Sequence, residues 1–212
     1  MQKLQVLGGK KLRGQIKISG SKNASLPILA ATLLSDQKIH LSNLPRVKDI
    51  ETMINLLKFI GSNIIISNNK KSILIQNKNN LKLFAPYSLV KTMRAGILVL
   101  GPMLARFRKA KVSLPGGCSI GTRPIDIHLK SLSKLGVKYN IYNGYVFAEA
   151  KNGLKGNKIK FPKISVGATE NLIIAACMAK GNTILSNCAI EPEIKDLIKF
   201  INKIGGRIKW IG

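Results

Sequence analysis

The sequence predicts an α/β fold in which one structural unit is repeated three times around a common axis, with helices inward and sheets outward. Each copy joins a helix of almost only apolar residues, a short apolar strand, and a second helix that ends at a glycine before another strand. The same point of each copy is marked by Phe59-Ile60-Gly61, Lys134-Leu135-Gly136 and Lys203-Ile204-Gly205. A repeat of roughly 70 residues with one fully apolar helix per unit has to bury those helices against one another.

The first unit is expected after an amino-terminal stretch, residues 4–19, whose alternating apolar residues predict two short strands with a turn. The motif Gly20-Ser21-Lys22-Asn23 then opens an apolar helix at 24–34. The rest of the unit is predicted as a strand at 38–41, an amphipathic helix at 50–60, and hairpin strands at 63–66 and 73–75.

The second and third units repeat this order. The second has an apolar helix at 88–104, a strand at 111–114, a glycine-rich loop at 115–124, a helix at 125–135 and a strand at 137–141. The third has an apolar helix at 171–179, a strand at 183–186, a helix at 193–204 and a strand at 207–210.

The composition indicates a folded protein with an unusual charge. The chain has 212 residues, 45% of them hydrophobic, and a net charge of +26 from 35 Lys and Arg against 9 Asp and Glu. A net charge of this size is typical of proteins that bind nucleic acid or an anionic membrane surface. The lysines are spread along the whole chain, however, without a dense basic block or interleaved aromatic residues. We therefore expect no nucleic-acid or membrane partner, and keep a basic nucleic-acid-binding protein as an alternative.

The cysteines and histidines indicate neither a disulfide framework nor a metal site. Cys118, Cys177 and Cys188 show no CxxC spacing, and His40 and His128 show no metal-binding spacing. The start of the chain lacks an apolar signal core, and no apolar run reaches the length of a membrane span. We expect a soluble protein of the reducing cytoplasm, with Cys177 in the core of its apolar helix.

The strongest candidate for chemistry is the loop 115–124, Pro-Gly-Gly-Cys-Ser-Ile-Gly-Thr-Arg-Pro. It joins a reactive thiol, Cys118, to the fixed charge of Arg123 on a backbone that can approach a ligand closely. Pro124 suits the first turn of the following helix, which would put the guanidinium at a positive helix end and favour an anion there. The alternative is that Cys118 is a small apolar residue in an ordinary loop.

Five motifs follow one another along the chain: Ser19-Gly20-Ser21-Lys22-Asn23-Ala24, Ala85-Pro86-Tyr87, Lys91-Thr92-Met93-Arg94-Ala95, the loop and helix at 115–128, and Ser165-Val166-Gly167-Ala168-Thr169. Together they resemble the UDP-N-acetylglucosamine 1-carboxyvinyltransferase family of enolpyruvyl transferases. The resemblance implies two similar domains, each an inside-out α/β barrel of three βαβαββ units in pseudo-threefold arrangement, with the substrates between them. Residues 21–212 would form most of one domain, residues 1–20 would be strands that pack with the second domain, and the second domain would be absent.

The resemblance also implies a reaction, the transfer of enolpyruvyl from phosphoenolpyruvate to the 3-hydroxyl of UDP-N-acetylglucosamine. This is the first committed step of peptidoglycan synthesis, and the family runs it without a cofactor or metal. Cys118 would be the proton donor, and Lys22, Asn23 and Arg123 would bind phosphoenolpyruvate. The residues implied to bind the sugar nucleotide are Arg94, Arg123, Pro124, Ile125, Asp126, Ile127, Lys163, Ile164, Ser165 and Val166.

Plain chemistry supports some of these roles and leaves others open. Lys22 and Asn23 begin an apolar helix whose free backbone N–H groups can hold phosphate, although Lys22 could be an ordinary solvated lysine. Arg94 inside a largely apolar helix would be an uncompensated charge unless an anionic ligand pairs with it. Asp126 and Glu170 could instead be first-turn acids that complement a helix dipole.

Two alternatives concern the reaction itself. The shikimate-pathway enolpyruvyl transferase carries Ser where Asn23 stands, has Asn-Ala-Gly-Thr before its arginine and lacks the Cys118 loop, and these departures favour the sugar-nucleotide enzyme. By the same resemblance, a general-base aspartate and a further phosphoenolpyruvate-binding arginine would lie beyond Gly212. We therefore expect the chain to be inactive alone. Either it is a fragment or truncated reading frame, or a separate chain supplies the second domain, and a further alternative is a non-catalytic sugar-nucleotide-binding remnant.

Overall fold

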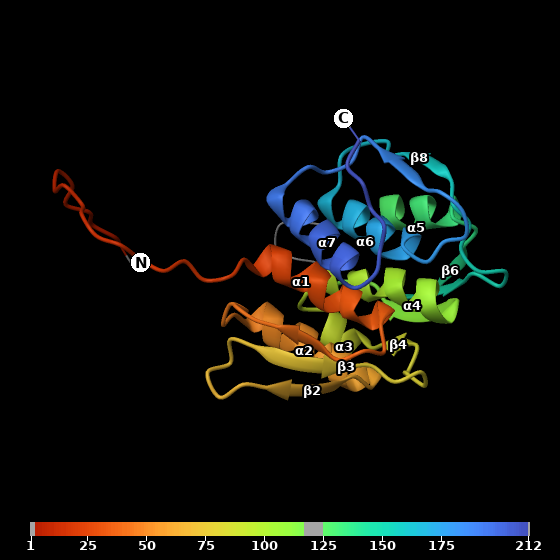
Figure 1. Ribbon diagram of the computed structural model, residues 1–212, viewed down its shortest axis with the longest axis horizontal. Coiled ribbons are helices and arrows are strands. Elements are labelled where there is room, and N and C mark those ends of the chain that lie inside the picture. Colours follow the sequence, from red (N-terminus) through yellow and green to blue (C-terminus); the bar gives the residue numbers. More distant parts are fainter. Residues whose placement is uncertain (1–2, 117–124, 212) are drawn as a thin grey trace.

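A computed structural model describes residues 3–116 and 125–211 of the chain. Residues 3–20 form neither helix nor strand and extend away from the rest of the molecule (Figure 1). The two strands expected at 4–19 are therefore wrong for this structure. Their apolar side chains, such as Leu4, Leu12 and Ile16, are more than 80% exposed, so the segment lacks the buried face that would hold a hairpin together.

The first unit has the predicted order of elements. It consists of α1 (Lys22–Ala31), the 3-10 helix η1 (Thr32–Leu34), β1 (Ile39–Leu41), α2 (Lys48–Ile60), β2 (Asn63–Ile66) and β3 (Ile73–Gln76). Its antiparallel sheet has the order β1-β3-β2, with Ile64 and Ile39 both opposite Ile75. Gly61 ends α2 at a φ of 116°, a left-handed conformation that favours glycine.

The second unit is a complete βαβαββ unit. It consists of β4 (Phe84–Ala85), α3 (Tyr87–Val90), the 3-10 helix η2 (Arg94–Val99), α4 (Leu100–Phe107), β5 (Lys109–Ser113), α5 (Asp126–Ser133), β6 (Lys138–Tyr142) and β7 (Tyr145–Glu149). The sheet order is β4-β5-β7-β6, with β4 and β5 parallel and the other neighbours antiparallel.

The single apolar helix predicted at 88–104 is wrong, because α3, η2 and α4 are separate pieces. Pro102 has no N–H to donate to the carbonyl of Leu98, so one backbone hydrogen bond of a continuous helix is missing here. Gly101 meets Asn171 so closely that a Cβ there would collide with its side-chain and backbone oxygens. Residues 94–107 therefore form an irregular helical segment that packs closely against α6.

The third unit contains β8 (Lys158–Lys160), α6 (Val166–Ala176), β9 (Ile184–Ser186) and α7 (Pro192–Lys203). Strands β8 and β9 pair in parallel. Helix α6 begins five residues before the predicted start at 171, because Ser165 caps it. The strand predicted at 207–210 is not formed.

The buried helices of the three units meet in the middle of the molecule. Leu29 and Ala30 of α1, Leu104 of α4, and Leu172 and Ile174 of α6 have no exposed surface. In Figure 1, β2, β6 and β8 lie at the periphery while α1, α4 and α6 lie between them. This arrangement confirms the predicted repeat with helices inside and sheets outside. In the part of the chain that the structure describes, no helix is long and apolar enough to cross a membrane.

Candidate functional site

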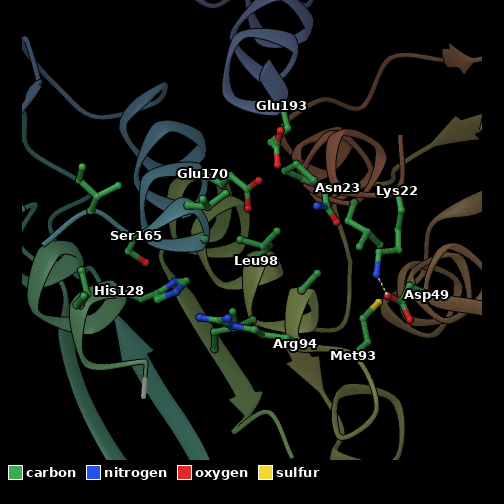
Figure 2. A pocket seen from close by; sticks show the side chains of 18 of the residues that line it. Lys22, Asn23, Asp49, Met93, Arg94, Leu98, His128, Ser165, Glu170 and Glu193 are labelled. Atoms are coloured by element: carbon green, nitrogen blue, oxygen red, sulfur yellow. Dashed lines mark ion pairs between the residues drawn. The ribbon is translucent and has the colours of Figure 1, made fainter. Parts of the chain in front are cut away.

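A cavity of about 720 Å³ opens where the amino-terminal ends of several helices meet (Figure 2). Its walls come from all three units. Nine of the predicted site residues line it: Lys22, Asn23, Arg94, Asp126, Ile127, Lys163, Ile164, Ser165 and Val166. Segments more than 140 residues apart in sequence are thereby brought to one place, although their roles in binding stay predictions.

Of the described site residues that were predicted, Ile125 alone does not line the cavity. Ile125 is buried at the amino-terminal cap of α5 and is absent from the cavity wall. Cys118, Arg123 and Pro124 lie outside the described residues.

Three cations stand at equivalent points of the repeat. Lys22 is the first residue of α1, Arg94 is the first residue of η2, and Lys163 lies three residues before α6. All three side chains belong to exposed residues on the wall of the same cavity. Our expectation that Arg94 lies inside a buried helix is wrong. Because Arg94 begins a helical segment at the cavity, its charge reaches solvent and any ligand there without a desolvation cost.

Two of the helix starts are capped in the same way. Ser21 and Ser165 have extended backbones, and their hydroxyl oxygens accept hydrogen bonds from the backbone N–H groups of Ala24 and Ala168, both at 3.4 Å. Neither α1 nor α6 has an acidic residue in its first turn. The positive ends of both helix dipoles are therefore left for an anion in the cavity.

An ion pair fixes Lys22, and sequence reasoning missed its partner. The Nζ atom of Lys22 lies 2.9 Å from a carboxylate oxygen of Asp49 on α2, and Figure 2 shows the pair at one side of the cavity. Both side chains are partly exposed, so the pair contributes little to stability but restricts the lysine. Asp49 lies near the start of an ordinary amphipathic helix, and nothing in its local sequence marks it.

His128 is the second residue that sequence reasoning missed. The pKa of His128 is lowered to about 4, first by burial and then by the charge of Arg94, while Asp126 opposes the shift. The Nδ2 group of Asn171 donates to the carbonyl of Ile97 at 3.2 Å, which orients the amide, and lies 3.2 Å from Nδ1 of His128. Nδ1 is then an acceptor, so the neutral ring carries its proton on Nε2, close to Gly167 at the cavity wall.

Glu170 is not the first-turn acid that we considered. It is the fifth residue of α6, its surface is only 5% exposed, and it lines the cavity. Burial raises the pKa of Glu170 to about 8, and Glu193 and Glu191 at the start of α7 act in the same direction, while Arg94 opposes them. At neutral pH its carboxyl is therefore mostly protonated. Asp126, by contrast, is the first residue of α5 and lies 3.7 Å from Lys130, as a first-turn acid would.

The two described cysteines are poor nucleophiles. Cys177 is half-buried at the end of α6, where burial raises the pKa of its thiol to about 12. Burial also raises the pKa of the half-buried Cys188. Among the described residues, no group of three or more His, Cys, Asp and Glu side chains is arranged to hold a metal ion.

A family comparison fits this geometry. The family model described as EPSP synthase (3-phosphoshikimate 1-carboxyvinyltransferase) matches residues 6–212. The chain belongs to this family.

The curated relatives narrow the likeness to the sugar-nucleotide branch. The UDP-N-acetylglucosamine 1-carboxyvinyltransferase of Pelagibacter ubique (strain HTCC1062) is 73% identical over 210 residues, which is 99% of this chain and 50% of the relative. The enzyme of the same name from Saccharophagus degradans is 50% identical over 212 residues, again with 50% of the relative covered. The chain thus spans about half the length of the curated relatives that it matches.

Solved structures support the fold. The enolpyruvyl transferase NikO from Streptomyces tendae has a TM-score of 0.80 at 17% identity, covering 97% of this chain and 48% of NikO. EPSP synthase from Acinetobacter baumannii has a TM-score of 0.66 at 17% identity, covering 86% of this chain and 42% of that one. The predicted enolpyruvyl transferase fold is confirmed.

Proposed function

We propose that this chain provides the sugar-nucleotide half of a UDP-N-acetylglucosamine 1-carboxyvinyltransferase. The observation that carries the proposal is the meeting of Lys22, Arg94 and Lys163, one from each repeat unit, at one cavity. Both substrates of the reaction are anionic, and cations combined with open helix N-termini bind phosphoryl oxygens well. The identity of 73% to the Pelagibacter ubique relative selects this acceptor over shikimate 3-phosphate.

The two capped helix starts divide the substrates between them. The start of α1, with Lys22 and Asn23, would hold phosphoenolpyruvate. The start of α6, with Lys163, Ile164, Ser165 and Val166, would hold the sugar nucleotide together with Arg94 and the segment from Arg123 to Ile127. The isoleucine and valine side chains carry no hydrogen-bonding group, so their contribution would come from backbone N–H and C=O groups.

Cys118 would deliver a proton to the methylene carbon of phosphoenolpyruvate while the acceptor oxygen forms the new C–O bond. Arg123, five residues away on the same loop, would favour the thiolate form and keep the proton exchangeable. The raised thiol pKa of both Cys177 and Cys188 leaves Cys118 as the cysteine suited to this step.

The general base would come from the second domain, supplied by a separate chain or by further sequence. Residues 1–20 would pair with that domain, and the described part of this segment, residues 3–19, is exposed. The reaction would serve peptidoglycan synthesis, and so cell wall biogenesis and division, in the cytoplasm. Loss of one positioned proton-transfer group costs about 10²- to 10⁴-fold in rate. The chain alone should then be catalytically silent.

Phosphate release in the presence of both substrates tests the proposal. We expect none from the purified chain, and release when it is mixed with the carboxy-terminal half of the Pelagibacter ubique relative. The acceptor must be UDP-N-acetylglucosamine. Turnover with shikimate 3-phosphate, or full activity from the 212-residue chain alone, would contradict the assignment.

A further inference from the structure

Acidic residues gather at the cavity in a chain that has few of them. Only 9 Asp and Glu residues stand against 35 Lys and Arg, yet Asp49, Asp126, Glu170 and Glu193 all line this cavity. Asp49 pairs with Lys22, and Asp126 lies near Lys130. The acids Glu170 and Glu193 have no such cation within ion-pair distance among the described residues.

Glu170 differs from the other acids in burial. It is 5% exposed, and within residues 3–116 and 125–211 no hydrogen bond or ion pair engages its carboxyl. Figure 2 shows its side chain directed from α6 into the cavity, with Glu193 above it and Asn23 at its side. The Glu170 carboxyl thus faces the cavity without a hydrogen-bond partner from the described chain, and a ligand in the cavity could supply one.

We propose that the Glu170 carboxyl, carrying its proton, donates a hydrogen bond to an oxygen atom of the sugar nucleotide bound in this cavity. This inference rests on the proposed function and assigns Glu170 as a residue that positions the ligand. A carboxylate at the same place would face the oxygens of an anionic ligand with its own negative charge. The protonated form therefore binds the ligand more tightly than the carboxylate, which has no proton to donate.

The surroundings of Glu170 favour the protonated form. Burial is the first cause, and the second is the pair of acids at the start of α7, which is packed against α6. The described titratable and charged groups presented to this region are Glu191 and Glu193 at the start of α7, Arg94 from η2, Asp126 and His128 from α5, Lys22 from α1, Asp49 from α2, and Lys163 just before α6. Among the described residues, the exposed Arg94 is the cation whose charge opposes protonation of Glu170. The only charged residue of α4, Arg106, is held by Leu33 and Asn79 instead.

The test is the affinity of the full chain for UDP-N-acetylglucosamine as a function of pH, measured by calorimetric titration. For the wild-type chain we expect constant affinity between pH 6 and 7, and a fall of about tenfold per pH unit above pH 8, because the protonated fraction falls tenfold per unit. Glu170→Gln keeps a neutral donor of similar shape, so it should match the wild type at pH 6.5 and hold its affinity at pH 9.

Two further variants complete the design. Glu170→Leu has no donor and should bind about tenfold more weakly at every pH, without the alkaline fall. Glu51→Gln, which changes an exposed acid of α2 outside the cavity, should behave as the wild type.

The outcomes separate this inference from the proposed function. If the wild-type chain does not bind the sugar nucleotide at any pH, the proposed function fails and the inference fails with it. If the wild type binds but Glu170→Gln retains the alkaline fall, another group such as the Cys118 thiol is responsible, and only the role of Glu170 is overturned. Unchanged binding by Glu170→Leu would overturn it as well.

Discussion

The amino-terminal ends of α1 and α6 are built alike but differ in one respect. Each has a serine cap with the same hydrogen bond at 3.4 Å, a lysine at or just before the helix, and an apolar body buried against the other units. They differ in their acids. At α1 the acid Asp49 is partly exposed and paired with Lys22, whereas at α6 the acid Glu170 is buried and unpaired among the described residues.

This difference indicates what each helix start is built to do. An ion pair 2.9 Å long satisfies Lys22 within the chain, so the α1 site is held ready at little cost. The α6 site keeps a buried acid that the described part of the chain does not satisfy. Functional sites commonly retain such costs because the ligand removes them. We therefore regard α6 as the start that is completed by its ligand.

The largest expected effect concerns stability and pH. Glu170 has its pKa raised from 4.5 to about 8, so the folded state binds a proton more tightly than the unfolded state. Its contribution to the free energy of unfolding is fully present below pH 4.5 and is lost as pH rises towards 8, by up to about 1.4 kcal/mol per pH unit. Glu170→Gln should remove this loss and stabilise the chain by a few kcal/mol at pH 8, as measured by urea unfolding.

His128 is expected to change the free energy of unfolding with pH in the opposite direction to Glu170. Its pKa is lowered from 6.5 to about 4, so its contribution is present above pH 6.5 and is lost as pH falls towards 4. Between pH 4.5 and 6.5 the two slopes oppose each other, and the wild type should vary little from these groups. In Glu170→Gln the free energy of unfolding should therefore rise with pH over this range, because only His128 contributes. If Glu170→Gln and the wild type both show a flat profile there, both assignments are contradicted.

Sequence reasoning succeeded where the signal is local. The glycines at 61, 136 and 205 follow their helices at positive φ, as the repeat predicted, and the family resemblance found nine of the residues that line the cavity. It failed where tertiary contacts decide. The close approach of α4 to α6 depends on the fit of Gly101 to Asn171, and Asp49, His128 and Glu193 reach the cavity only through the packing of separate helices.

Three strands were also missed, for different reasons. Strand β8 has lysines at two of its three positions, so no apolar run marks it, and β4 has only two residues. Strand β7 did carry a signal, because Val146 and Ala148 are buried while Phe147 between them is exposed. That alternation within Tyr145–Glu149 would have identified it as a half-buried strand.

The smallest expected effect comes from the two caps. Ser21→Ala and Ser165→Ala should each lower the free energy of unfolding by about 1 kcal/mol, because each removes one acceptor for a helix N–H group. The two costs should be similar, since the hydrogen bonds are alike. Replacement by glycine at either cap should cost only a few tenths of a kcal/mol. A cost confined to one cap would show that the two helix starts are not equivalent in stability.

The most direct test of the central claim is a calorimetric titration of the purified chain with UDP-N-acetylglucosamine, comparing two lysines. Our account predicts binding to one site. Lys163→Ala should weaken it about 10- to 100-fold, the value of a charge-assisted hydrogen bond of about 1.5–3 kcal/mol. Lys22→Ala, at the start assigned to phosphoenolpyruvate, and Lys158→Ala, on β8 outside the cavity, should weaken it less than about threefold. Absence of binding, or equal losses for Lys22→Ala and Lys163→Ala, would contradict the account.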